Sequence, residues 1–483
     1  MSAWRKLCTL GKPLKAPLLM AFPNPPCSFT DKFSANQSEK PIRFLTINYG
    51  CQMNSADSEE MAQPLEHRGF LATSKLHEAD IVLMNTCTVR DQAEHRADSN
   101  IGRLRVWKGK DPNRILIVAG CAASRWGDSI KKKYPFIDLV SPATRIEQFP
   151  EAVAQVLKER WNWGEETKGL FGNVGAGLVP ALSNPPHVNP SHTDSVRAAT
   201  RAAPTDSGNP FGDEGTAYVT IMRGCNYSCS YCIVPQVRGR ESYRPMPDVL
   251  AEIETKVKAG YREIMLLGQT VNSYHWRDMR DVGAAGWPPG NGDSTHSDPI
   301  DNLSIPQGGQ PPAPTGPLDF SDLLRAIDAL PGVEKIRFMS PHPRHMKDRV
   351  IEAMAECHKV ARHIHLPVQS GSDRLLSAMK RLYTRTEYLA IVEKLRAAMP
   401  GILITTDIIV GYPGETPADF EATLSLLRQV RFDGLFAFKY SPRPGTASAE
   451  AVDDVFDRTK ENRLQEVLAL NTEIKNVPLE VPA

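Results

Sequence analysis

Three cysteines crowd into one short stretch of the chain. Cys225, Cys229 and Cys232 lie in RGCNYSCSYCIVP, with the spacing C-x3-C-x2-C. Thiolates are the usual ligands of iron–sulfur clusters, and three of them can hold three irons of a [4Fe–4S] cube while the fourth stays open to a small molecule. A structural zinc site is the alternative. Zinc usually takes four closed ligands, however, and no further Cys or His follows at close spacing.

A second set of three cysteines is spread over the first quarter of the chain. Cys51, Cys87 and Cys121 each end an apolar, β-rich run: RFLTINYGC, IVLMNTC and ILIVAGC. Helical or polar sequence follows each run, which is typical of parallel strands joined by crossover helices. Because ligands gather beyond the carboxyl ends of such strands, we expect these thiols to meet and hold a second cluster. A buried apolar thiol is the alternative for any one of them.

The second half of the chain carries the elements that must position the close-spaced cysteines. Amphipathic segments there separate six strand-like runs: AYVTIMRG, REIMLLGQ, VEKIRFMS, RHIHLPVQ, ILITTDIIVG and GLFAFKYS. Residues 319–330 place apolar side chains on one helical face, and 416–430 begins with Thr416 as its N-cap. In the tail helix we expect Leu464, Val467, Leu468 and Ile474 to face inward. Repeated β/α units predict a partial or full (β/α) barrel with chemistry at the strand-end loops. The loop with Cys225 follows the first of these strands.

Changes of composition along the chain mark the expected domains. Residues 161–213 and 277–317 are rich in Pro and Gly without apolar periodicity, as linkers and surface loops are. We expect a poorly ordered tail over 1–42, a first domain over 43–160, a disordered linker over 161–213, a second domain over 214–450 with an inserted loop at 277–317, and a C-terminal helix over 451–483. The basic start of the chain predicts an upstream mis-start before Met20, with an organellar presequence as the alternative.

Charge and composition restrict the classes of function. Of the 483 residues, 41% are hydrophobic and 23% charged, which excludes wholesale disorder. No stretch approaches the roughly 18 uninterrupted apolar residues of a membrane span. Nine scattered cysteines do not suit a secreted disulfide framework, so we expect a cytoplasmic protein with reduced thiols. The net charge is only +1, so RNA binding requires a local basic patch. Arg238, Arg240 and Arg244 carry fork-shaped guanidinium groups that suit phosphates. The alternative is that these arginines are solvated or salt-bridged.

The cysteine loop, with Tyr231 before its third cysteine, resembles the radical S-adenosylmethionine (SAM) superfamily. Together with YGCQMN, NTCTVRDQAEHR, AGCAAS, LLGQTVNSY, HLPVQSGSDRLLSAMKR and DIIVGYPGET, it resembles the methylthiotransferases over about 43–160 and 214–475. The resemblance implies an α/β protein in which an N-terminal parallel-sheet domain precedes a radical SAM partial TIM barrel. It also implies two [4Fe–4S] clusters, one on each set of three cysteines. A C-terminal TRAM barrel, general in this family, is expected to be missing after residue 475.

The reaction that the resemblance implies needs two SAM molecules. One, cleaved by an electron from the cluster of Cys225, Cys229 and Cys232, yields a radical that removes hydrogen from C2 of an N6-prenylated adenine at position 37 of tRNA. The other methylates sulfur carried by the second cluster, and the methylthio group adds at C2. Implied partners are tRNA, an electron donor such as flavodoxin or ferredoxin, and a sulfur source, with the chain a monomer. Alternatives are threonylcarbamoyl-adenosine tRNA or a ribosomal-protein aspartate as substrate, and a non-catalytic metal-binding RNA-interaction protein.

The same resemblance marks residues for SAM contacts. These are Tyr231, Gly268, Gln269, Gln369, Ser370, Ile409 and Gly411. The alternative for the strand-end residues among them is that they satisfy the backbone of their own loops. Four histidines flanking strands receive no role, namely His342, His345, His363 and His365. Cys357 is expected to be a core thiol, and Cys8 and Cys27 to be uninvolved.

Overall fold

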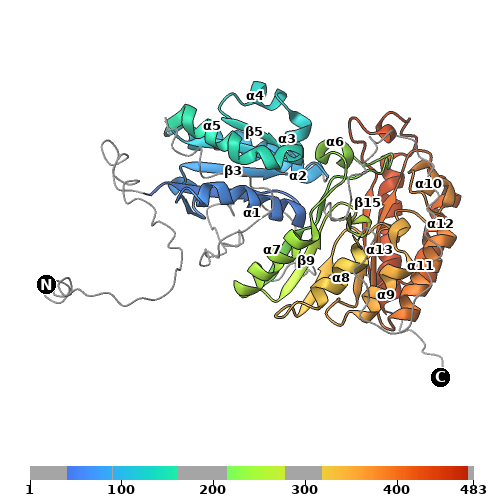
Figure 1. Cartoon of the computed structure of the whole chain (residues 1–483). Helices are drawn as coiled ribbons and strands as arrows, with labels where there is room; N and C mark the ends of the chain where they lie inside the picture. Colours follow the sequence, from blue (N-terminus) through green and yellow to red (C-terminus); the bar gives the residue numbers. More distant parts are fainter. Residues whose placement is uncertain (1–40, 90, 162–214, 278–317, 477–483) are drawn as a thin grey trace, which may run out of the picture. The chain divides into compact units, whose positions relative to one another are not determined.

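The computed structural model describes residues 41–89, 91–161, 215–277 and 318–476 (Figure 1). The expected tail, linker and inserted loop fall almost wholly outside these ranges, as do Cys8 and Cys27. Residues from Arg43 onward form one compact unit. Within the described ranges, no helix is both long enough and apolar enough to cross a membrane.

The N-terminal part is a five-stranded parallel sheet in the order β2-β1-β3-β4-β5. Its strands are β1 (Arg43–Asn48), β2 (Leu71–Ala72), β3 (Ile81–Thr86), β4 (Ile115–Gly120) and β5 (Leu139–Pro142). Its helices are α1 (Gln52–Glu66), α2 (Asp91–Gly109), α3 (Cys121–Trp126), α4 (Ser129–Lys133) and α5 (Phe149–Trp161), with 3-10 turns η1 (Leu76–Glu78) and η2 (Ala143–Gln148). Every residue of β3 and β4 is buried, which explains their unbroken apolar runs.

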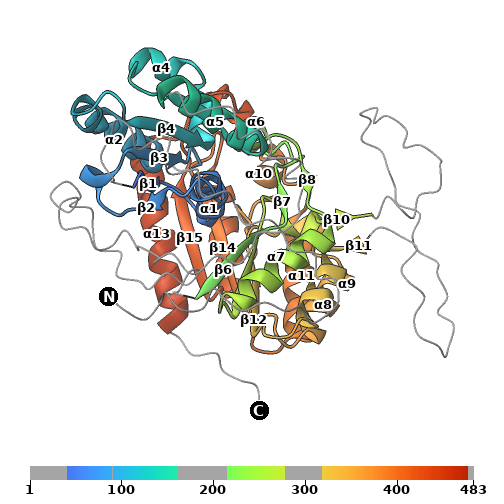
Figure 2. The ribbon, with the colours of Figure 1, turned by 60° about the vertical axis from the view of Figure 1, so that its left-hand side comes forward.

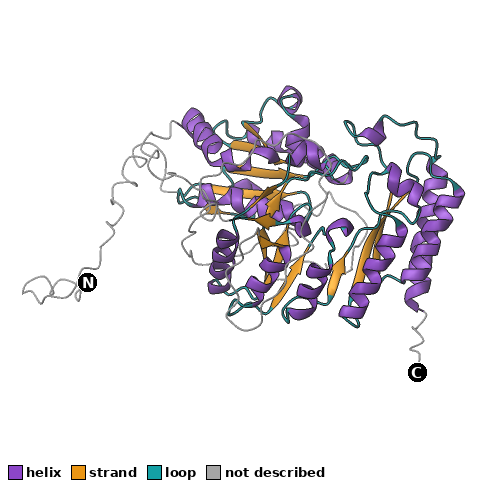
Figure 3. Cartoon of the chain, turned by 45° about the vertical axis from the view of Figure 1, so that its right-hand side comes forward, coloured by secondary structure: helices purple, strands orange, loops and turns teal. Residues whose placement is uncertain are grey.

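The second part contains two three-stranded parallel sheets, β12-β9-β6 and β13-β14-β15 (Figures 2 and 3). A parallel bridge between Ile336 and Val360 links β12 to the segment leading into β13. The strands are β6 (Thr216–Thr220), β9 (Glu263–Leu267), β12 (Lys335–Phe338), β13 (His363–His365), β14 (Leu403–Val410) and β15 (Gly434–Lys439). Each of the six predicted runs therefore forms a strand, and the partial (β/α) barrel is confirmed.

Helices cover the barrel strands, and short antiparallel ribbons join them. The helices are α6 (Val234–Arg238), α7 (Met246–Lys258), α8 (Phe320–Asp328), α9 (Asp348–Glu356), α10 (Asp373–Ala378), α11 (Arg385–Ala398), α12 (Pro417–Val430) and α13 (Asp457–Asn476). The ribbons pair β7 (Met222–Arg223) with β8 (Ser242–Tyr243), and β10 (His275–Trp276) with β11 (Leu318–Asp319). The 3-10 turns are η5 (Val271–Ser273), η7 (Pro343–His345) and η8 (Ala447–Ala449).

Side-chain contacts explain the start of helix α12 and the buried face of helix α13. Thr416 caps α12: its hydroxyl accepts from the Asp419 amide, and the Asp419 carboxylate accepts from the Thr416 amide at 2.9 Å. This confirms the predicted N-cap. The predicted inward stripe of α13 is partly wrong, because Leu468 is 39% exposed while Val467 is fully buried. The buried face of α13 carries Val467 and Leu470 together with Arg463, which pairs with Glu415 at 2.6 Å.

Gly371 lies where the loop after β13 passes α12. A Cβ there would come within 2.5 Å of the Ala422 carbonyl oxygen and 2.6 Å of the Thr423 Cα. Because both are backbone atoms, we predict that Gly371→Ala lowers the free energy of unfolding by about 2 kcal/mol in urea titrations. Gly109→Ala, at the exposed end of α2 with nothing within 4 Å, is the control and should be neutral or stabilising. Equal destabilisation of both variants would contradict the prediction.

Candidate active site

The three widely spaced cysteines lie at one edge of the N-terminal sheet. Strands β1, β3 and β4 are adjacent and parallel, with Thr86 of β3 opposite Gly120 of β4. Cys87 and Cys121 directly follow the ends of β3 and β4, and Cys51 immediately precedes α1. Burial is the main reason why the pKa of Cys121 is raised to about 12; the Arg238 charge lowers it, and the nearby thiols of Cys87 and Cys51 contribute to the rise. The structure thus brings Cys51, Cys87 and Cys121 together; we call them the sheet-edge cysteines.

The three closely spaced cysteines lie between β7 and α6; we call Cys225, Cys229 and Cys232 the loop cysteines. The Cys232 amide donates to the Cys229 carbonyl at 3.0 Å, which curls the loop. Burial is the main reason why the pKa of Cys232 is raised to about 12, and the thiols of Cys229 and Cys225 contribute to the rise because they lie nearby. The glycine before the loop, Gly224, has φ +77°, and a Cβ there would collide with the Arg240 carbonyl.

Both sets suit a [4Fe–4S] cluster. Within the described ranges, no three His, Cys, Asp or Glu side chains lie close enough for one metal ion. A cube of four irons is wider than one ion and takes each thiolate on a separate iron, so three neighbouring but separated thiols fit it. All six side chains carry thiols rather than disulfides. Burial disfavours the charged thiolate form of these side chains, and the positive charge of bound iron would stabilise it.

A buried guanidinium lies beside each set. Arg381 donates to the Cys229 sulfur at 3.3 Å, and Arg238 donates through Nε to the Cys121 sulfur at 3.1 Å. Burial lowers the pKa of Arg238, but Asp57 and the thiols of Cys121 and Cys51 outweigh burial and raise it. Both arginines are therefore charged and face sulfur. Neither Arg381 nor Asp57 was marked by sequence reasoning, although Arg381 lies within the quoted stretch HLPVQSGSDRLLSAMKR.

The three arginines predicted to contact RNA have different surroundings. Arg238 is only 7% exposed and pairs with Asp57, so the structure does not favour its predicted phosphate contact. Arg244 donates to the Thr220 carbonyl at 2.8 Å and pairs with Glu252 at 2.5 Å. Arg240 is exposed, and no described carboxylate pairs with it. Of the three, Arg240 alone is exposed without a described carboxylate partner, and its contact with a phosphate stays a prediction.

Two buried acceptors near Cys225 fit the ammonium group of SAM. The Oε1 atoms of Gln269 and Glu241 are buried and have no hydrogen-bond partner within the described structure. Gln269 precedes Thr270, whose hydroxyl lies 3.5 Å from the Cys225 sulfur, and the carboxylate of Glu241 raises the pKa of Cys225 after the larger effect of burial. Sequence reasoning marked Gln269 but missed Glu241, which gave no signal beyond lying next to the arginine-rich stretch.

Comparison with known proteins adds a family. The model "Radical SAM superfamily" matches residues 219–427, and "Uncharacterized protein family UPF0004" matches 43–142. The tRNA-2-methylthio-N(6)-dimethylallyladenosine synthase of Sorangium cellulosum is 41% identical over 87% of this chain and 76% of its own length. That of Syntrophus aciditrophicus is 37% identical, over 89% and 79%.

The chain belongs to the tRNA-2-methylthio-N(6)-dimethylallyladenosine synthase family. A solved structure agrees with the fold: the radical SAM methyltransferase TsrM from Kitasatospora setae superimposes with a TM-score of 0.53. The match covers 85% of this chain and 77% of that chain at 16% identity, and so concerns the fold alone.

In this member of the family, Tyr231 and Ile409 pack in one cluster with Tyr412 and Tyr440. Gly268, which directly follows β9, packs closely against Met222. A Cβ at this position would come within 2.5 Å of the Met222 side chain. The cluster with Ile409 and Tyr412 lies beside the cysteine loop, since the hydroxyl of Ser230, within that loop, lies 2.8 Å from that of Tyr412. A role in SAM binding stays a prediction for all of them.

The other predicted SAM-contact residues differ in their hydrogen bonds. The backbone amide of Gln369 donates to the Asp407 carbonyl of β14 at 2.9 Å, and the Ser370 hydroxyl accepts from the Ser372 amide at 3.2 Å. Gly411, at φ +72°, donates its backbone amide to the Glu415 carboxylate. Of these residues, Ser370 is the one whose side chain satisfies loop backbone, as the alternative expects. Cys357 is buried in the barrel core, as expected.

Two histidines without a predicted role pack on the cysteine loop. His342 stacks on Tyr227 with ring centroids 4.2 Å apart, and His345 Nε2 lies 2.7 Å from the Tyr227 hydroxyl. The His342 Nδ1 accepts from the Arg344 amide at 3.2 Å, which makes Nε2 the protonated nitrogen. Burial lowers the pKa of His342 to about 2 and that of His345 to about 4, so both rings are neutral at neutral pH.

The lowered pKa of His342 predicts a pH dependence of stability. The unfolded chain takes up a proton near the ordinary pKa of 6.5, whereas the folded chain does not, so stability is full above 6.5 and falls as pH falls. We predict that wild type loses about 1.4 kcal/mol more than His342→Phe between about pH 7.5 and about pH 5.5. Urea unfolding of the apo protein at both pH values measures this, and His358→Gln, at an exposed position, should behave like wild type. An equal loss in wild type and His342→Phe would contradict the prediction.

Proposed function

We propose that this protein replaces the hydrogen at C2 of N6-dimethylallyladenosine, at position 37 of tRNA, with a methylthio group. The family and the radical SAM domain support this reaction. The single structural observation that carries the proposal is the link between the two sets of thiols. Arg238 ends the helix that follows the loop cysteines, and its guanidinium reaches Cys121 of the sheet-edge set.

The cofactors of this proposal are SAM and two [4Fe–4S] clusters. When bound, they supply the radical that removes the C2 hydrogen and the sulfur that takes its place. The loop cysteines would hold the cluster that leaves an iron open to SAM, and the sheet-edge cysteines the other. Gln269 and Glu241 offer acceptors to the SAM ammonium group. Arg381 places a positive charge against the Cys229 sulfur.

The chain's own task is to hold one adenine carbon within reach of both sets of cysteines. Proximity of this kind replaces an encounter in solution by an effectively unimolecular step. Arg240, exposed and beside the loop cysteines, is suited to a tRNA phosphate. We further infer that flavodoxin or ferredoxin provides the electron, that a separate sulfur source replenishes the second cluster, and that the protein acts as a monomer.

The proposal is tested in cells by deleting the gene and analysing tRNA nucleosides by mass spectrometry. We expect methylthio-dimethylallyladenosine to disappear and dimethylallyladenosine to accumulate, because prenylation precedes C2 modification. A plasmid-borne wild-type copy should restore the methylthio nucleoside. Unchanged methylthio-dimethylallyladenosine, or a loss confined to methylthio-threonylcarbamoyladenosine, would remove the proposed substrate.

The two sets of cysteines should have separable roles. After anaerobic reconstitution we expect about eight irons per wild-type chain and about four in each single-set variant. Cys225→Ala should abolish formation of 5′-deoxyadenosine from SAM. Cys87→Ala should still form it while ending methylthiolation, because only the sulfur-carrying site is lost. A Cys87→Ala enzyme that still methylthiolates would show that the division of roles is wrong.

A further inference from the structure

A short helix connects the two sets of cysteines. Helix α6 begins at Val234, two residues after Cys232, and ends at Arg238, whose side chain touches Cys121. Arg238 lies six positions after Cys232, and the five residues of α6 extend about 8 Å along the helix axis. A stiff element this short leaves little freedom in the distance between the loop cysteines and the sheet-edge cysteines.

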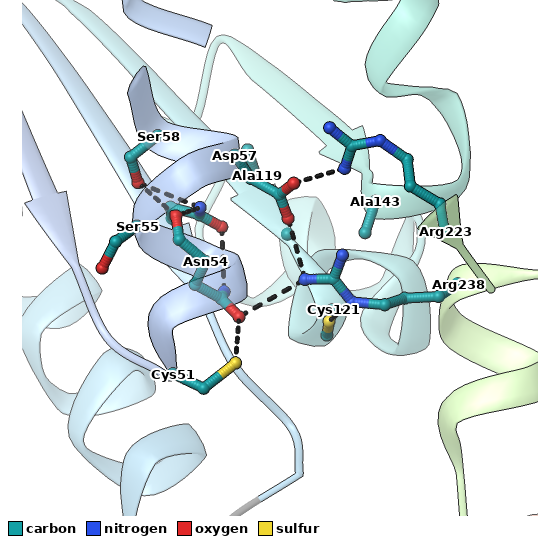
Figure 4. Close-up of polar contacts among 12 residues, drawn as sticks. Cys51, Asn54, Ser55, Asp57, Ser58, Ala119, Cys121, Ala143, Arg223 and Arg238 are labelled. Atoms are coloured by element: carbon teal, nitrogen blue, oxygen red, sulfur yellow. Dashed lines mark hydrogen bonds and ion pairs between the residues drawn. The ribbon is translucent and has the colours of Figure 1, made fainter. Parts of the chain in front are cut away.

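A single buried carboxylate anchors both ends of the cysteine loop. Arg238 donates to the Asp57 Oδ2 at 2.8 Å, and Arg223 donates to the other oxygen of the same carboxylate (Figure 4). Arg223 lies two residues before Cys225, so one arginine precedes the loop and the other follows it. The side chain of Asp57 is only 2% exposed. The loop is thus attached at both ends to helix α1 of the N-terminal part.

The same helix carries the contact to a second sheet-edge cysteine. Asn54 lies one turn before Asp57 on α1, and its Oδ1 is 3.4 Å from both the Cys51 sulfur and the Arg238 NH2. Its amide nitrogen donates to the Thr86 carbonyl at 2.9 Å, which holds the side chain in place. Arg238 therefore contacts the sheet-edge cysteines at two points, directly at Cys121 and through Asn54 at Cys51.

We propose that Asp57, Arg223 and Arg238 form an interlock that fixes the separation of the two sets of cysteines. They are positioning residues, and the proposal rests on the proposed function, because that reaction needs both sets near one carbon. An arginine suits the place because its planar fork reaches sulfur, amide and carboxylate at once, which an ammonium cannot do. The charges balance, since Glu60 pairs with the second arm of Arg223. Removing Asp57 or one of the two arginines would leave a buried charge without its partner.

The first test needs no cofactor. In the full-length apo protein, we expect Arg238→Gln to increase the rate of Cys121 alkylation by iodoacetamide about tenfold: the covering guanidinium is gone and the interface opens more often, and this outweighs the loss of the charge that lowers the pKa of Cys121. Peptide mass spectrometry gives the rate for each cysteine, and Cys357, in the barrel core, should keep its wild-type rate. Arg238→Lys should fall between wild type and Arg238→Gln. Arg240→Gln removes the same charge from an exposed position two residues away and should leave Cys121 unchanged.

The second test uses the reconstituted holoenzyme. We expect Asp57→Asn to keep the full iron content, to weaken the magnetic coupling between the two reduced clusters in electron paramagnetic resonance, and to lower methylthiolation about tenfold relative to 5′-deoxyadenosine formation. If Arg238→Gln does not fold, Arg238→Lys and Asp57→Asn carry the test. Wild-type alkylation of Cys121 in folded Arg238→Gln, or unchanged coupling in Asp57→Asn, would overturn the interlock. Failure of the proposed function alone would abolish methylthiolation in wild type and leave the alkylation results intact.

Discussion

The ion pair between Arg238 and Asp57 is the contact on which the arrangement of the candidate site depends. Its partners lie 181 positions apart in the chain, and both are buried. A buried pair of this kind costs desolvation, so its presence is better explained by specificity than by stability. Here the specificity is spatial, because the guanidinium that pairs with Asp57 also touches Cys121. The Arg238 side chain therefore contacts both a carboxylate and a thiol, and these contacts connect the second part of the fold to the N-terminal part.

Parallel strand pairing provides the second constraint. The sheet-edge cysteines come from three separate β/α units, yet they converge because β1, β3 and β4 are neighbours that run in the same direction. The loop cysteines follow the first barrel strand for the same topological reason. The sheet-edge set would not form in an antiparallel arrangement, where successive strand ends point to opposite edges.

Local sequence was a sufficient guide wherever one segment decides its own structure. The apolar runs of β3 and β4, the cap at Thr416 and the six barrel strands were all predicted, because periodicity, capping and burial act within a few residues. The structure does not favour the predicted phosphate contact of Arg238, and it leaves Leu468 of α13 exposed where the sequence predicts it to face inward. An arginine in a basic stretch resembles a surface cation until its carboxylate partner is known, and the buried face of α13 includes Arg463, whose partner Glu415 lies 48 positions away.

What the sequence alone determined was the inventory of chemistry: two sets of three thiols, their place at strand ends, and the resemblance that names a radical reaction. Those features are identified from residue types and their spacings, which do not depend on residues far away in the sequence. Only the tertiary structure decided which charges are buried, that the Gln269 and Glu241 oxygens lack partners in the described residues, and that helix α6 joins the two sets. Burial and pairing are properties of surroundings assembled from the whole chain, and no local pattern contains them.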